Sequence, residues 1–175
     1  MIRHAIACLS LLALAASPAP DHDAVAYHFQ RAGDPRVFAW LVRAGLRAHQ
    51  SAARLTAAER FASAAALADE AGADASARSW LLFGSARLLM WADNARALGA
   101  LDAAEPLALA ADDRPLAAHI RFTRGQLLAL RGAIRRGVAT MEREIGALDA
   151  LPDEHRLQSG THLALTAIAA LLSDG

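Results

Sequence analysis

Small and large side chains recur along this chain with the spacing of packed helices. One pattern occurs three times. A small residue is followed four positions later by a large residue, and three positions after that by a small or polar one. Each copy starts 40 residues after the previous one. Residues three and four apart share one face of a helix, so each copy predicts a helix that buries this face. The copies are Ala57/Phe61/Ala64, Ala97/Leu101/Ala104 and Gly137/Met141/Glu144.

A glycine precedes each copy, at Gly45, Gly84 and Gly125, with steps of 39 and 41 residues. A repeat of about 40 residues has the length of one helical hairpin, which cannot bury its own apolar face. We expect the small residues to let helices approach closely, while the large residue of each copy fills the space opposite. Stacked hairpins share a core and leave extended surfaces, so the pattern favours binding over catalysis.

Capping residues mark the limits of the predicted helices. Thr56 is followed by Glu59 with the spacing of a capping box, which predicts a helix start. Asp34-Pro35 predicts another start, and Gly33 and Gly72 are typical of helix ends. The predicted helices span residues 21–31, 35–51, 56–72, 74–91, 93–111, 113–132, 133–151 and 153–172.

The helices pair into a predicted all-α, right-handed α-solenoid of about three and a half antiparallel hairpins. A short linking helix at 21–34 comes before this repeat domain, which covers 35–175. Because solenoids normally end in a polar capping repeat, we expect the chain to be part of something longer. The hairpins are expected at 35–72, 74–111 and 114–151, with half of a fourth at 153–175.

Residues 1–20 allow two interpretations. A basic start, the apolar run 5–16 and the small residues 17–20 imitate a signal peptide, which would place the protein in the periplasm or outside the cell. Alternatively, the run is a buried helix of a cytoplasmic protein. In either case it is too short for a membrane span, which needs about 20 apolar residues.

Composition excludes several classes of function. The chain is 55% hydrophobic, and its 18 basic residues balance 18 acidic ones, so no overall field attracts nucleic acid or anionic membrane. All basic residues are arginine, which excludes lysine Schiff-base chemistry and a P-loop lysine from this segment. The single cysteine, Cys8, cannot form an internal disulfide.

The repeat resembles the tetratricopeptide repeat (TPR). Trp80-x2-Phe83-Gly84 is similar to the start of that motif, and Ala57-x3-Phe61-x2-Ala64 to its second half. The period of about 40 exceeds the 34 residues of the family, and the proline that usually ends each repeat is missing. The resemblance implies a protein-interaction module with no enzymatic activity.

A second resemblance involves residues 21–34, which are similar to a stretch that recurs in LuxR-type regulators with a large ATPase domain, the group containing the maltose regulator. In that group, the stretch joins a winged-helix region to the repeats. The resemblance implies a cytoplasmic, effector-sensing part of a bacterial transcription regulator. It favours the buried-helix interpretation of residues 1–20, and an exported envelope scaffold is the alternative. Neither the ATPase motif nor the DNA-binding helix-turn-helix of the group occurs in this sequence.

Candidate catalytic and metal-binding residues do not form a convincing set. His155 and His162 share a helix face, and His22 lies between two aspartates, but the sequence contains no HExxH or CxxC motif. Arg135-Arg136 is too short a basic run for nucleic acid. We therefore expect no catalytic, cofactor or metal site, and we expect Trp40, Trp80 and Trp91 to fill the core.

The concave groove of such repeats, which the first helix of each hairpin lines, is the candidate binding site. Its mixture of polar and apolar side chains suits a peptide, a protein or another domain of the same regulator. Transferring the motif register from the three glycines places these residues in the groove: Val42, His49, Gln50, Arg78, Ser85, His119, Phe122 and Gln126.

Overall fold

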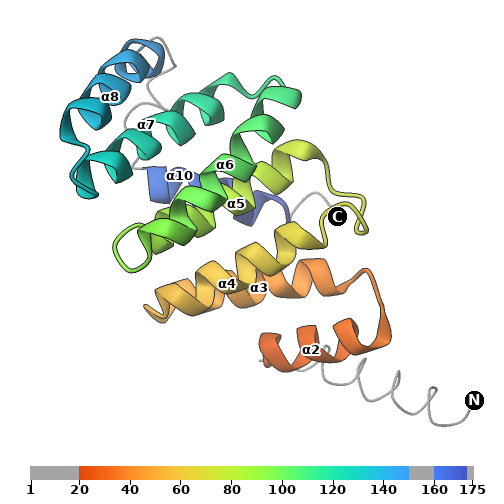
Figure 1. Ribbon diagram of the computed structural model, residues 1–175. Coiled ribbons are helices and arrows are strands. Elements are labelled where there is room, and N and C mark those ends of the chain that lie inside the picture. The colour runs from red at the N-terminus through yellow and green to blue at the C-terminus, as the bar shows by residue number, and fades with distance from the viewer. Residues whose placement is uncertain (1–19, 150–159, 173–175) are drawn as a thin grey trace, which may run out of the picture.

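The computed structural model describes residues 20–149 and 160–172 (Figure 1). All elements within these ranges are helices, which confirms the predicted all-α class. The helices are α2 (His22–Ala32), α3 (Val37–Gln50), α4 (Arg54–Ala66), α5 (Ala75–Leu89), α6 (Asn94–Ala110), α7 (Arg114–Leu130), α8 (Ile134–Asp149) and α10 (Gly160–Ala170).

From α2 to α8, each helix packs against the next one along the chain. The stack begins with α2 at one end and finishes with α7 and α8 at the other (Figure 1). Short turns join the helices, so α3/α4, α5/α6 and α7/α8 form hairpins. This is a helical repeat-like architecture. Residues 1–19, with their two interpretations, lie outside the described residues.

Aspartate side chains begin four of the helices. The carboxylate of Asp74 accepts a hydrogen bond from the Ala77 backbone N–H at 2.7 Å. Asp21, Asp93 and Asp113 cap α2, α6 and α7 in the same way. Each cap satisfies a backbone donor that the first helical turn leaves without a partner.

The predicted capping box is wrong. Helix α4 begins at Arg54, and its N-cap residue is Ala53, which makes no side-chain cap bond. Ala52 adopts a left-handed conformation (φ 62°) that turns the chain sharply after α3. The helix can therefore begin before Thr56, which lies inside its first turn.

The first two copies of the repeated pattern form the centre of the core. All six side chains are fully buried: Ala57, Phe61, Ala64, Ala97, Leu101 and Ala104. In the third copy Gly137 is buried, but Met141 and Glu144 are only half-buried. Helix α8 packs against α7 but has no later helix on its other side among the described residues, so its face is less covered.

Two of the three repeat glycines allow the close approach of helices that the sequence predicted. A Cβ atom on Gly45 would lie 2.5 Å from the Phe61 ring, and one on Gly125 would lie 2.7 Å from Met141 Cγ and 2.9 Å from the carbonyl oxygen of Gly137. In these two hairpins the large residue of the repeat therefore lies directly over the glycine. Gly84 differs, because a Cβ there would meet Ile168 of α10 at 2.5 Å.

Helix α10 does not stack on α8 as half of a fourth hairpin would. It packs against α5 and, less extensively, α3. Ala164 and Ile168 are fully buried there, in the space that the missing side chain of Gly84 leaves open. The part of the predicted last helix at 153–159 lies outside the described residues.

The tryptophans are less buried than expected. Trp40 and Trp80 are half-buried against the core, whereas Trp91 is 69% exposed. Trp91 lies in the turn after α5 ends, so no helix face directs it inward. Within residues 20–149 and 160–172, no helix has the length and apolar content that crossing a bilayer requires.

Substituting Gly137 tests the close contact between α7 and α8. A Cβ atom on Gly137 would lie 2.6 Å from the Gly125 carbonyl oxygen and 2.7 Å from the Ala129 nitrogen, both backbone atoms that cannot move aside cheaply. We expect Gly137→Ala to lower the free energy of unfolding by about 1–3 kcal/mol, as overpacking does. Gly146→Ala in the same helix meets nothing within 4 Å and should raise that free energy by up to about 1 kcal/mol. Urea denaturation measures both, and equal effects would contradict the close contact.

Substituting Ile168 tests the position of α10. Ile168→Ala removes a fully buried side chain and should lower the free energy of unfolding by about 2–5 kcal/mol. Thr166→Ala changes an exposed position of the same helix and should be nearly neutral. A neutral result for both variants in thermal melts would mean that α10 is not docked on α5.

Candidate functional site

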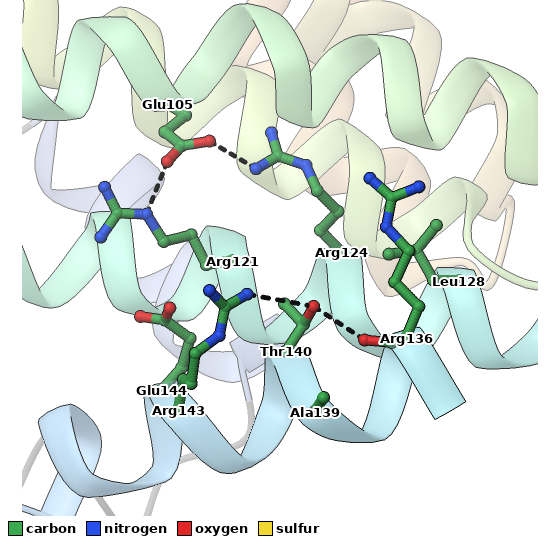
Figure 2. A pocket seen from close by; sticks show the side chains of 9 residues that line it. All are labelled: Glu105, Arg121, Arg124, Leu128, Arg136, Ala139, Thr140, Arg143 and Glu144. Atoms are coloured by element: carbon green, nitrogen blue, oxygen red, sulfur yellow. Dashed lines mark hydrogen bonds and ion pairs between the residues drawn. The ribbon is translucent and has the colours of Figure 1, made fainter. Parts of the chain in front are cut away.

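A cleft of about 460 Å³ opens between α6, α7 and α8 (Figure 2). Arginine is its most frequent lining residue. The lining consists of Glu105 from α6, Arg121, Arg124 and Leu128 from α7, and Arg136, Ala139, Thr140, Arg143 and Glu144 from α8.

Helical spacing brings these side chains to common faces. On α7, Arg121 and Arg124 are three residues apart and Leu128 follows four later, so all three share one face. On α8, Arg136 and Arg143 are seven residues apart, which is two turns. Leu128 is the only large apolar side chain in the lining, so no packed core fills the gap between the walls.

Glu105 holds two of the arginines in place. Its Oε1 accepts a hydrogen bond from Arg121 Nε at 2.5 Å, and its Oε2 forms an ion pair with Arg124 Nη1. Arg124 also binds Asp102 through Nη2 at 2.9 Å. These bonds fix the guanidinium groups of α7 against α6.

Opposing effects set the pKa of the Glu105 carboxyl group. Burial acts to raise this pKa, because the side chain is only 20% exposed. Hydrogen bonds and charge from Arg124 and Arg121 together outweigh burial, and the pKa lies below its ordinary value of 4.5. Glu105 is therefore a carboxylate at neutral pH.

The two arginines that α8 contributes to the cleft, Arg136 and Arg143, make fewer polar contacts than those of α7. Among the described residues, no carboxylate lies within ion-pair distance of Arg136 or Arg143. Arg143 Nη2 donates a long hydrogen bond of 3.4 Å to Thr140 Oγ1, which itself donates to the Arg136 carbonyl oxygen at 2.9 Å. Four guanidinium groups and two carboxylates line the cleft, and Asp102 pairs with Arg124 from outside the lining, so one positive charge remains in excess.

This arrangement is suited to binding rather than proton transfer. A guanidinium group stays protonated in proteins and presents a planar set of N–H donors that matches a carboxylate or a phosphate. The cleft is thus an anion-attracting region in a chain whose total charge is balanced.

The structure buries part of the groove predicted from the sequence. Val42 is fully buried in the core, and Ser85 is buried with its Oγ donating to the Ala58 carbonyl oxygen at 2.9 Å. Neither side chain is open to a ligand in this conformation. The reason is that the helix faces bearing them pack against neighbouring helices. His119 is also buried, with its ring 6.4 Å from that of Phe83.

The other predicted groove residues are at least partly open but have separate surroundings. Arg78 forms an ion pair with Asp69 at 2.7 Å, and Gln126 accepts a hydrogen bond from Arg87 at 3.0 Å. The remaining three are His49 and Phe122, which are half-buried, and Gln50, which is exposed. Helix α10 packs against α5 and α3, the two helices that carry five of the predicted groove residues.

The arginine cleft was not predicted from the sequence. Of its residues, the sequence pattern singled out Arg136 only as part of a short basic run and Glu144 only as the last position of the third repeat copy. The available signal was the helical spacing of the arginines, at three residues in α7 and seven in α8. That spacing does not reveal that the two faces meet.

The histidine candidates do not gather into a metal site. His22 packs against Trp40, with the ring centroids 5.5 Å apart, and its pKa is lowered by burial and then by Arg47 and Arg43. In the described part of the chain, no three His, Cys, Asp or Glu residues are placed to hold a metal ion together. Cys8 and His155 lie outside the described residues.

Comparison with known proteins leaves the function to be argued from geometry. No protein-family model, curated protein or solved structure matches the chain.

The ion pairs of Glu105 predict a pH dependence of stability. Because the folded pKa is depressed, the stabilisation is present above the ordinary value of 4.5 and is lost as pH falls through the folded pKa. We expect Glu105→Gln to lower the free energy of unfolding by about 1–2 kcal/mol at pH 7, since the pairs are partly open to solvent. The difference from the unsubstituted protein should shrink below pH 4.5 in chemical denaturation. Glu142→Gln, at an exposed position of α8, is the control, and a constant difference from pH 7 to about pH 3 would contradict the prediction.

Proposed function

We propose that this chain is a non-catalytic, TPR-like α-solenoid that binds another protein. The observation that carries the proposal is a set of exposed apolar side chains on α8. Ile134 is 62% exposed, Val138 39% and Ile145 45%. They lie at spacings of four and seven residues and so share one face, which we call the α8 stripe.

The equivalent positions of the earlier hairpins indicate what this face of a helix normally contacts. Forty residues separate successive copies, so Val138 and Ile145 correspond to Leu98 and Glu105 of α6, and to Ala58 and Ala65 of α4. Ala58 and Ala65 are buried, and the carbonyl of Ala58 accepts the hydrogen bond from Ser85 of α5. The corresponding face of α4 therefore receives the following helix.

Helix α6 uses the same face in the same way. Glu105 binds Arg121 and Arg124, which belong to the following helix, α7. On α8 this face bears apolar side chains that remain exposed, while α10 packs elsewhere. Exposed apolar patches of this kind mark protein-interaction surfaces. The proposed partner is a helix with an apolar face, from another domain of the same protein or from a separate protein.

The resemblance of residues 21–34 to LuxR-type regulators supports a more specific proposal. In this proposal, the chain is the effector-sensing or interaction segment of a bacterial transcription regulator in the cytoplasm. DNA sequence flanking the reading frame that encodes an ATPase domain and a helix-turn-helix would support it. An exported envelope scaffold is the alternative, and cell fractionation with N-terminal sequencing distinguishes the two: a mature protein beginning near residue 20 would exclude the cytoplasmic proposal.

Charges placed in the α8 stripe test the interaction. Affinity capture with the tagged chain, followed by mass spectrometry, identifies candidate partners, and calorimetry with each purified partner measures its Kd. We expect Val138→Asp combined with Ile145→Asp to weaken binding at least about tenfold, because two carboxylates would be buried against an apolar surface.

Ala103→Asp combined with Ala147→Asp adds the same charge at exposed positions of α6 and α8 and should leave Kd unchanged. All variants should melt near the temperature of the unsubstituted protein, since the substituted side chains are open to solvent. If a partner bound the stripe variant as tightly as the original chain, the α8 stripe would be excluded as the binding surface. Failure to find any stoichiometric partner would count against the proposed protein-binding function.

A further inference from the structure

We propose that the cleft between α6, α7 and α8 is a binding site for a small ligand with two negatively charged oxyanion groups. The two groups are those of a pyrophosphate-type ester or of a dicarboxylate. This inference goes beyond the proposed function and does not depend on a protein partner. It rests on the charge of the cleft, on the way its arginines are held, and on its size.

The excess positive charge of the cleft lies on the α8 side. Glu105 and Asp102 engage the arginines of α7, while Arg136 and Arg143 of α8 face no carboxylate within ion-pair distance in the described part of the chain. These two arginines lie two helical turns apart, about 10 Å along the axis. A ligand with two anionic groups can therefore contact both, and each arginine can bind one group with paired N–H donors.

The arginines of α7 are held before any ligand arrives. Their bonds to Glu105 and Asp102 restrict side-chain rotation, so less conformational entropy is lost when an anion binds.

The dimensions suit a small molecule. A volume of about 460 Å³ lies within the range of roughly 300–1,000 Å³ typical of ligand sites. Leu128 of α7 and Ala139 of α8 are the apolar residues of the lining and can contact the carbon skeleton between two charged groups.

The cleft and the α8 stripe lie on different sides of α8. At about 100° per residue, Arg136 and Val138 are separated by roughly 160° around the helix axis. Arg143 and Ile145 are related in the same way. The ligand and a protein partner can therefore bind α8 without competing for the same side chains.

Titration calorimetry at low ionic strength tests the site with two probes, inorganic pyrophosphate and succinate. We expect saturable binding of at least one probe by the full chain. Arg136→Gln combined with Arg143→Gln should weaken it by about tenfold or more. Arg131→Gln combined with Arg135→Gln removes the same charge from two exposed positions outside the cleft lining and should change Kd less than about twofold.

One further double variant makes the test specific. Val138→Asp combined with Ile145→Asp should retain most of the binding, so that failure of the anion site and failure of the protein-interaction site can be told apart. Far-ultraviolet circular dichroism verifies that each variant is folded.

The outcomes separate the ligand classes. Binding of pyrophosphate alone assigns the cleft to phosphate esters, and binding of succinate alone assigns it to dicarboxylates. The proposal is overturned if neither probe binds saturably up to about 10 mM, or if both arginine double variants lose affinity equally, which would indicate attraction by overall charge.

Discussion

The close approach of helices at glycine determines how the rest of this protein is arranged. Gly125 and Gly137 face each other so closely that either Cβ would collide with the backbone of the other helix. Gly45 accepts the ring of Phe61, and Gly84 accepts Ile168 of α10. At each site the missing side chain lets a neighbour fill the space, and the resulting packing sets which faces remain for solvent.

Helix α8 carries the main consequence of this packing. Its buried residue Gly137 lies on the side nearest α7. The flanking faces are therefore both open: one bears Arg136 and Arg143, and the other bears apolar side chains. The arginine face is kept apart from α6 by long charged side chains, so a cleft remains instead of a packed core (Figure 2). A single tightly held helix thus provides two surfaces of different chemistry.

Local features of the fold were predictable from sequence, because each depends on a few neighbouring residues. The predicted helix starts at residues 74, 93 and 113 coincide with the aspartates that cap α5, α6 and α7, and such a cap acts within the first helical turn. The contact of Gly45 with Phe61 follows from the hairpin that joins them. The capping box at Thr56 failed because the chain turns at Ala52, in the left-handed region that alanine rarely adopts, and α4 begins at Arg54 before Thr56.

The amino-acid sequence by itself determined that the chain forms helices, where most of them begin, and which small and large residues bury the first two repeated faces. These depend on periodicity and capping, which act over a few residues. Only the tertiary structure decided that α10 returns to Gly84 instead of extending the stack, and that the arginines of α7 and α8 line one cleft with Glu105. Both depend on which faces meet across distant segments, and residue spacing within one helix carries no information about the helix opposite.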